Sequence, residues 1–545
     1  MSPRVDTSTG IAVSESSADD RRGAGASMAS RATATTTSAT VVGAITLVSR
    51  VFGFVRVLVV AAILGVGDLG NAFQSSNSMS NVLFELLAAG ALSAVLVPVF
   101  VSARERNDSE GGDELASRLL TVALVALGAL TVVAIATAPW LADLLTVGTD
   151  PAVRDDQRAL TTVLLVWFLP QTVFYAWGAI AGAQLHARRR FVAVAVAPIA
   201  NTVVTVGALL VFRSVAGAEP GLDLDRSATV WLGVAGTGGV LSFVGVIVVA
   251  ARRAGSRLGL RRQVWNREVA SVLASSAWGV ALHTAGAIFL FAAMIGGNSV
   301  AGGAIAYQTA FVFFLAPYAV LAQPIQTVVH PELSADAAAE AWDRFAERLR
   351  QSVDRTVVVA APVAAIGTAV ALPAMSTVAF GSSGEGRGAE LIAAALASLL
   401  VGVVGYSLFL LLARASFALG DAKTPAIVAI GATGFGALLI AAVAPQFDGN
   451  ARVAVLGLSH SMSYALGAGA MVVVLRRRLR RPIWSMPRIG FLVAIVASTA
   501  VAVGVTRTVG TSGRPGAAFA VTVGAGCVGS LWWLARGSAR VRELR

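Results

Sequence analysis

Long apolar runs, separated by short polar segments, recur along the chain from about residue 40 to residue 536. A membrane-spanning helix needs about 20 mostly apolar residues, and fourteen runs are long enough. The pattern therefore predicts an all-α polytopic membrane protein with 14 transmembrane helices. The expected spans are residues 40–66, 76–103, 118–144, 159–184, 191–213, 227–251, 269–296, 302–329, 355–380, 388–413, 424–445, 451–475, 486–508 and 515–536.

The segment before the first apolar run has a different composition. Residues 1–39 are rich in Ser, Thr, Ala and Gly, with mixed charges and no apolar stretch. A signal peptide would need an apolar segment near the start and a small-residue cleavage site. We therefore expect residues 1–39 to form a disordered cytoplasmic tail.

The basic residues give an independent check on this topology. With the tail inside, 32 of the 42 Lys and Arg residues fall in segments expected to be cytoplasmic, and eight fall in outer segments. The remaining two are Arg50 and Arg56, inside the first span. Because cytoplasmic loops of membrane proteins carry the excess of Lys and Arg, this distribution predicts a plasma-membrane protein with both termini cytoplasmic.

Two pairs of similar segments indicate an internal repeat. VLVPVFVSA around Pro98 matches TVVHPELSA around Pro331, and the segments that start at Gln184 and Phe417 also match, both at an offset of 233 residues. Six spans separate the copies, so the repeat is parallel. The predicted units are an N-lobe at 40–251, a basic cytoplasmic linker at 252–268, a C-lobe at 269–475, two further helices within 486–536 and a cytoplasmic C-terminus at 537–545.

Composition agrees with a membrane protein. The chain is 56% hydrophobic and 13% charged, against roughly 25% charged residues in a soluble domain. A net charge of +12 would suggest nucleic-acid binding in a soluble protein, but the placement of the charges explains it by topology, so no nucleic acid is expected. The single cysteine, Cys527, and four scattered histidines indicate neither a disulfide framework nor a metal site, and no cofactor is expected.

Three charged residues lie inside the first two spans, where charge costs about 2.5 to 3.5 kcal/mol each. These are Arg50, Arg56 and Glu85. Such residues usually face a partner or a water-filled cavity. Two interpretations stay open: a polar substrate cavity, or a buried Arg–Glu pair that only joins two helices.

Polar residues of the second span share one helical face. Asn77, Asn81 and Glu85 are spaced at i, i+4 and i+8, and Gln74 lies about one turn earlier. If the polar cavity is the correct interpretation, we expect Asn77, Asn81 and Glu85 to bind substrate. Further prolines and amides inside spans predict broken helices that line a polar interior. They are Pro170, Gln171, Pro198, Asn201, Pro317, Gln323, Pro324 and Gln326.

Other features fit a transporter better than an enzyme. We find no phosphate loop, HExxH motif or nucleophile arrangement. Two intramembrane histidines, His283 and His460, are candidates for a coupling or a structural role. In the longest expected cytoplasmic loop, Trp342, Phe345 and Leu349 share one helical face, which suits a helix in the membrane interface.

Four segments together resemble the MurJ/MviN family of lipid II flippases. They are SRVFGFVR from Ser49, NVLFELLAAGALSAVLVPVF from Asn81, GAQLHARRRF from Gly182 and ARASFALGDAKTP from Ala413. The second segment is similar to the actinobacterial variant of the family. The resemblance implies a member of the multidrug/oligosaccharidyl-lipid/polysaccharide exporter superfamily, with 14 helices and a cavity lined by helices one, two, seven and eight.

The implied activity is movement of undecaprenyl-pyrophosphate-linked disaccharide-pentapeptide from the inner to the outer leaflet by alternating access. The resemblance implies that Ser49, Arg50 and Arg56 meet the pyrophosphate, and an arginine fork suits phosphate geometry. Asp421 resembles one ligand of a sodium site in some relatives. The expected seventh helix contains no acid, so sodium coupling is not supported.

Three alternatives remain open. The chain exports another polyprenyl-linked glycan or a drug, or it is a non-transporting scaffold that recruits cell-wall synthesis proteins, or it is a membrane glycosyltransferase. The last would need acidic residues in an outer loop, and the acidic pairs there lack a companion histidine. We therefore expect no enzyme activity.

Overall fold

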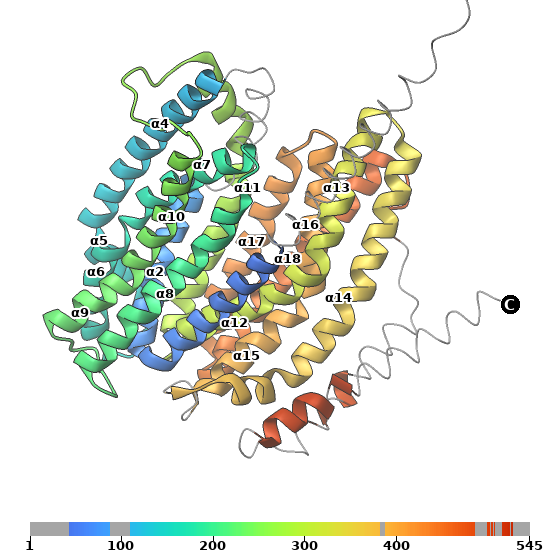
Figure 1. Cartoon of the computed structure of the whole chain (residues 1–545). Helices are drawn as coiled ribbons and strands as arrows, with labels where there is room; N and C mark the ends of the chain where they lie inside the picture. Colours follow the sequence, from blue (N-terminus) through green and yellow to red (C-terminus); the bar gives the residue numbers. More distant parts are fainter. Residues whose placement is uncertain are drawn as a thin grey trace, which may run out of the picture.

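The computed structural model describes residues 43–87, 109–381 and 387–484, and residues 499–501, 503–504, 506, 515–523 and 525–526. All regular secondary structure in these ranges is helical (Figure 1). Ten helices there are long and apolar enough to cross a membrane, or up to eleven if one bent pair counts as a single span. This confirms the all-α polytopic class. The predicted spans 76–103, 486–508 and 515–536 lie partly outside the described residues, so the count of fourteen stays a prediction, as do both terminal segments.

The second helix begins earlier than predicted. The first helix is Gly43–Leu64, and α2 is Asp68–Leu87, which starts eight residues before the predicted position 76. Serines in the middle of α2 are buried and donate hydrogen bonds to residues more than 80 positions further along the chain. Ser76 Oγ donates to the carbonyl oxygen of Thr161 at 3.3 Å, and Ser80 Oγ donates to that of Phe168 at 2.6 Å. A search for apolar runs cannot recognise such residues as part of a buried helix.

Several predicted spans in the first half are broken helices. Pro170 separates α6 from α7, as its ring predicts, and the π-helix η1 interrupts the sixth span. The glycines of this break allow close packing, because a Cβ on Gly236 would lie 2.3 Å from the ring of Phe168. The elements are α4 Ser109–Ala136, α5 Ala138–Leu145, α6 Arg154–Phe168, α7 Gln171–Ala187, α8 Phe191–Ala216, α9 Arg226–Gly233, η1 Val234–Gly238 and α10 Gly239–Arg253.

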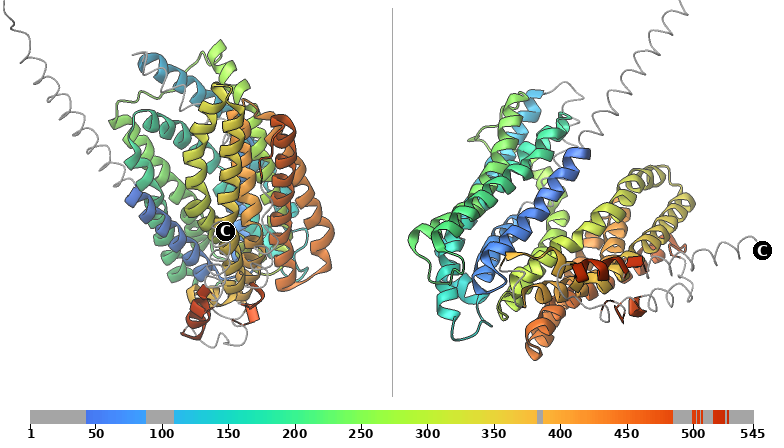
Figure 2. Two further views of the ribbon diagram at one scale, coloured as in Figure 1. Left: turned by 90° about the vertical axis from the view of Figure 1, so that its right-hand side faces the viewer. Right: turned by 60° about the horizontal axis from the view of Figure 1, so that its bottom comes forward.

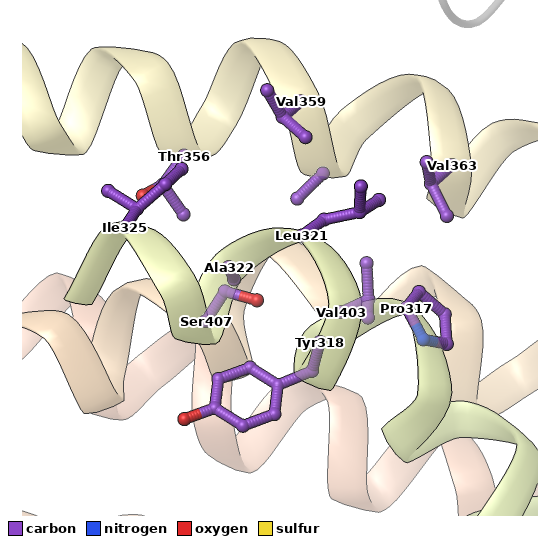
Figure 3. Close-up of a pocket in the computed structure, with 11 residues that line it drawn as sticks. Pro317, Tyr318, Leu321, Ala322, Ile325, Thr356, Val359, Val363, Val403 and Ser407 are labelled. Carbon is purple, nitrogen blue, oxygen red and sulfur yellow. The ribbon is translucent and has the colours of Figure 1, made fainter. Parts of the chain in front are cut away.

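The second half contains a comparable break. A π-helix, η2, follows Pro317, and its side chains pack against α14 and α16 (Figure 3). The bent pair α15 and α16 turns by 47°. The elements are α11 Arg267–Asn298, α12 Gly303–Pro317, η2 Tyr318–Ala322, α13 Gln323–Ala338, α14 Trp342–Val378, α15 Gly388–Val401, α16 Val403–Ala418, α17 Lys423–Val443 and α18 Gly449–Leu479.

The predicted interface helix is part of a longer helix. The segment that starts at Trp342 forms the first turns of α14, which continues without a break to Val378. Phe345 and Leu349 are fully buried and pack with Leu333 of α13. Phe345 and Leu349 therefore face protein and not the membrane interface as predicted, whereas Trp342 is 40% exposed.

The helices up to Arg253 and those from Arg267 onward form two groups that lie side by side (Figures 1 and 2). The first helix, in blue, runs between the green group and the yellow and orange group in the right-hand view of Figure 2. Helix α2 packs against α11, and their apolar side chains share one core that includes Met79, Leu83 and Phe289. Any polar space beside the first helix and α2 therefore lies where the two groups meet.

Candidate functional site

A polar cavity of about 210 Å³ lies beside the first helix and α2. Side chains from α7, α8, η1, α10 and α12 complete its walls. Its polar lining residues are Arg56, Gln74, Asn77, Asn81, Tyr175, Asn201, Thr205, Gln308 and Thr309. The structure thus brings together Arg56, Asn77 and Asn81, three of the residues predicted to bind substrate.

Arg56 is the charged group of this cavity. The other described residues that line it are uncharged amides, hydroxyls and apolar side chains. Its Nη1 donates a hydrogen bond of 3.3 Å to Oδ1 of Asn201 on α8. An amide partner orients the guanidinium without neutralising it, so the cavity keeps a net positive charge. A cation in such a setting favours an anionic ligand.

Asn201, the hydrogen-bond partner of Arg56, is connected through Thr205 to η1, the π-helix that interrupts the sixth span. Thr205 Oγ1 lies 3.1 Å from Oδ1 of Asn201 and 2.9 Å from the carbonyl oxygen of Ala235. Ala235 belongs to η1, where the regular α-helical hydrogen-bond pattern is interrupted. The π-helix therefore supplies an acceptor that helps to place Thr205 and Asn201, and through them Arg56.

Close packing at Gly239 makes this arrangement testable. A Cβ at Gly239 would lie 2.4 Å from Thr205 Oγ1 and 2.6 Å from Asn201 Oδ1. We expect Gly239→Ala to displace both side chains and to destabilise the fold by roughly 1–3 kcal/mol, measured as a lower melting temperature in detergent. Gly245→Ala in the same helix is the matched control, because nothing lies within 4 Å of its Cβ. Equal melting temperatures for the two variants would contradict this account.

The α2 wall presents amide groups to the cavity. Gln74 Nε2 donates to Ser78 Oγ at 3.0 Å. Within the described part of the chain, Asn77 and Asn81 form no side-chain hydrogen bond with protein. On the facing wall, Oε1 of Gln308 is buried and has no partner among the described residues. Buried amide groups normally find partners, so this wall suits a ligand that carries both donors and acceptors.

Two predicted residues of the first helix lie outside this cavity. Arg50 is exposed, and its position six residues before Arg56 places it about 9 Å further along the helix axis. Ser49 is buried but does not line the cavity. The side chain of Glu85 is outside the described residues, so its pairing with either arginine stays a prediction.

The candidate coupling residues lie in separate places. His460 is enclosed by aromatic rings, including those of Phe289 and Phe314, and its Nδ1 is 3.2 Å from Oη of Tyr307. His283 is exposed on α11. Among the described residues, no group of three or more His, Cys, Asp or Glu side chains is placed to hold a metal ion.

Asp421 lies in the turn between α16 and α17, where its carboxylate contacts the start of α17 and the end of α18. It accepts hydrogen bonds from Thr424 N at 3.0 Å, from Thr424 Oγ1 at 2.7 Å and from Arg478 Nη1 at 2.7 Å. Burial acts to raise the pKa of Asp421, but the Thr424 hydrogen bonds and the Arg478 charge outweigh it and lower the pKa. All of these contacts are made with residues of the protein itself.

We therefore expect Asp421→Asn to keep transport activity and to lose stability. A depressed pKa means that the carboxylate stabilises the fold above its unfolded pKa of about 4, and that this contribution is lost as the pH falls through the folded value. The melting temperature of the variant should lie below that of the wild type near neutral pH, and the difference should shrink in acid. Asp223→Asn, at an exposed loop position, is the control. A stable but inactive Asp421→Asn protein would assign a coupling role instead.

Sequence reasoning missed several residues that line the cavity. Tyr175, Thr205, Gln308 and Thr309 were not predicted, and Asn201 was recognised only as an amide inside a span. Gln308 is an isolated amide in an apolar run, which is the kind of signal that identified Asn201. The hydroxyl residues carry no such signal, because threonine and tyrosine are common in buried helices that bind nothing.

Two other cavities fit an anionic ligand less well. One of about 440 Å³ lies between α14, α15 and residues 503 and 506, and its charged lining residue is Glu390. The other, at η2, measures only about 10 Å³, which is the space of a single water molecule at most. In Figure 3, Val359 and Val363 of α14 face this break, and the Tyr318 ring points away from them.

Comparisons with known proteins agree with the arrangement of the helices. The family model for the lipid II flippase MurJ matches residues 60–522. A "Lipid II flippase MurJ" from Burkholderia cenocepacia is 27% identical over 402 residues, which cover 72% of this chain and 74% of the relative. A "Probable lipid II flippase MurJ" from Rhizobium meliloti is 26% identical over 398 residues, or 71% of each chain.

Solved structures show the same fold at lower sequence identity. A lipid II flippase MurJ in an inward closed conformation superposes with a TM-score of 0.71 at 15% identity, covering 93% of this chain and 100% of that one. An inward-facing multidrug-resistance transporter of the MATE family gives 0.59 at 13% identity, covering 79% and 94%. Because the family model extends over most of the chain, this multi-span membrane protein belongs to the MurJ family of lipid II flippases, which are transporters.

Proposed function

We propose that this chain moves lipid II, the undecaprenyl-pyrophosphate-linked disaccharide-pentapeptide, from the inner to the outer leaflet of the plasma membrane. The observation that carries the proposal is the cavity between the two helix groups, with Arg56 as its charged group and amides around it. Arg56 binds the pyrophosphate, because a guanidinium donates two parallel hydrogen bonds to phosphate oxygens. Asn77, Asn81 and Gln308 bind the neighbouring sugar groups.

The size of the cavity calls for movement of the two groups. A cavity of about 210 Å³ is smaller than the roughly 300–1,000 Å³ of sites for drug-sized ligands. It can therefore hold the pyrophosphate end of the substrate but not the complete head group. We infer that the two helix groups are the predicted N-lobe and C-lobe and that they separate to admit the rest, as alternating access requires.

Contacts of Asn71 join the two groups at the start of α2 and α12. Asn71 is fully buried, and its Nδ2 donates to the carbonyl oxygen of Val300 at 2.8 Å. Its Oδ1 accepts from the backbone N–H groups of Ala304 at 2.9 Å and Ile305 at 3.3 Å. One side chain of the first group thus holds three backbone groups of the second.

Neighbouring contacts strengthen this connection. Ser75 Oγ donates to Oδ1 of Asn298 at 3.0 Å, and Nδ2 of Asn298 donates to the carbonyl oxygen of Leu145 at 2.9 Å. Gly302 has a φ of +78°, and a Cβ there would lie 2.2 Å from the carbonyl oxygen of Val66. We call these contacts of Asn71, Ser75, Asn298 and Gly302 the outer lock. With both chain termini cytoplasmic, as we propose, it closes the cavity on the outer side.

Depletion of the protein in living cells tests the proposed function. If the chain flips lipid II, labelled lipid II should disappear from the outer leaflet and accumulate inside, and the wild-type gene should restore it. A host without a second flippase is needed. Normal outer-leaflet lipid II after depletion would refute the proposal, and accumulation of another polyprenyl-linked glycan would identify that glycan as the substrate.

The scaffold alternative makes a different prediction. A protein that only recruits cell-wall synthesis enzymes needs its surfaces but no positive charge in a cavity. Full rescue of depleted cells by Arg56→Ala would therefore favour the scaffold.

A further inference from the structure

The segment that joins α10 to α11 is basic and lies in a defined position. Residues 252–267 contain six arginines and no acidic residue. The segment passes the upper end of α4 at the top left of Figure 1. We call residues 254–266 the strap. Its role goes beyond the proposed transport of lipid II.

Three backbone N–H groups fasten the strap to α4. Those of Arg257, Gly259 and Arg261 donate to Asp113 Oδ2 at 3.0 Å, Ser117 Oγ at 3.2 Å and Thr121 Oγ1 at 3.0 Å. The acceptors are four residues apart on one helical face, which is about 6.0 Å along the axis. Two extended residues span about 6.6 Å. The two spacings match, so the strap follows the helix in register.

Other contacts hold the start of the strap. Arg188 donates from Nη1 to the carbonyl oxygen of Ala254 at 2.7 Å and pairs through Nη2 with Asp113 at 2.9 Å. Ser256 is buried and hydrogen-bonded to Gln184. A loop that serves only to orient the chain during membrane insertion has no need of such anchors.

Several basic and apolar side chains of the strap are exposed to the surroundings of the protein. Arg257, Arg261 and Arg262 are exposed and form no ion pair with a described residue. Leu260 and Trp265 are each 69% exposed. The anchor at Thr121 lies about 12 Å further along α4 than the anchor at Asp113, within the predicted span 118–144. The exposed aliphatic, aromatic and basic groups thus lie where the predicted span begins.

We propose that the strap binds anionic phospholipids of the inner leaflet. Arg257, Arg261 and Arg262 contact head-group phosphates, and Leu260 and Trp265 enter the boundary of the acyl chains. Arginine clusters beside a membrane span attract anionic lipid, and tryptophan favours the interface because its ring is apolar and its N–H is polar. Fixed backbone geometry lowers the entropy that binding costs, since the backbone that carries Arg257 and Arg261 is already held in place.

Lipid titration of the full-length chain in neutral detergent tests this site. Phosphatidylglycerol should raise the melting temperature of the wild type in a saturable manner, because a ligand of the folded state stabilises it, and phosphatidylcholine should not. R261Q/R262Q keeps the backbone anchors and should need roughly tenfold more phosphatidylglycerol for the same shift. R213Q/R226Q removes two exposed arginines elsewhere and should behave like the wild type. An unchanged response of R261Q/R262Q would overturn the proposal.

A second measurement locates the strap directly. Leu260→Cys in a Cys527→Ser background offers one thiol for an environment-sensitive dye in proteoliposomes. Spin-labelled phosphatidylglycerol should quench the dye more strongly than spin-labelled phosphatidylcholine. Equal or absent quenching by the two lipids would show that anionic lipid does not occupy the strap and would leave an acidic protein segment as the better partner. Because neither assay involves lipid II, failure here would not bear on the proposed transport.

Discussion

Arg56→Ala should slow transport of lipid II at least thirtyfold while leaving the protein folded. The variant removes the charged group of the cavity and leaves Asn201 Oδ1 without its guanidinium donor. In the proposed complex, Arg56 forms a buried charge pair with the pyrophosphate. Loss of one partner from such a pair costs about 2–5 kcal/mol. This corresponds to at least a thirtyfold lower rate if the pair stabilises the transition state of transport. The outer-leaflet lipid II of depleted cells that carry the variant measures this directly.

Three further variants make the result specific. Arg56→Lys keeps the charge but loses the planar fork, so we expect partial activity. Arg50→Ala should have a smaller effect than Arg56→Ala, because Arg50 is exposed and does not line the cavity. Arg213→Ala removes an exposed arginine far along the chain and should be neutral. Normal transport by Arg56→Ala, with normal expression and melting temperature, would show that Arg56 does not bind the pyrophosphate.

Asn71→Ala should open the outer side of the cavity. The substitution removes one donor and one acceptor that hold three backbone groups of the second helix group. Each buried group left unpaired costs about 1–3 kcal/mol. A total near 3 kcal/mol would shift the balance between closed and open states by more than 100-fold. The closed state alone bears this cost, because water can reach these groups once the lock is open.

Labelling from outside measures that shift. Thr309→Cys in a Cys527→Ser background places one thiol at the cavity wall. An impermeant maleimide added outside should react with it much faster when Asn71→Ala is also present. Asn450→Ala is a matched control, because Asn450 donates to Glu390 within the second helix group. Unchanged labelling in a folded Asn71→Ala protein would show that the lock does not control access.

The sequence predicted the secondary structure well where apolar periodicity is strong. The span predicted at 191–213 corresponds to α8, Phe191–Ala216, and that at 269–296 corresponds to α11, Arg267–Asn298. Prediction failed for the start of α2, since its serines and asparagines are buried by contacts with distant helices. It also failed for the start of α14, because an apolar helix face looks the same whether protein or lipid covers it.

Some residues of the candidate site could be predicted from the sequence, and others join it only through tertiary packing. Asn77 and Asn81 could be placed together because four residues complete about one helical turn, and Arg56 was identified by the cost of a charge within an apolar run. These are local properties of the chain. Asn201, Thr205 and Gln308 join them only when α8 and α12 pack beside the first helix. Their contribution depends on contacts between residues more than 100 positions apart, as between Arg56 and Asn201, and no local pattern records which helices become neighbours.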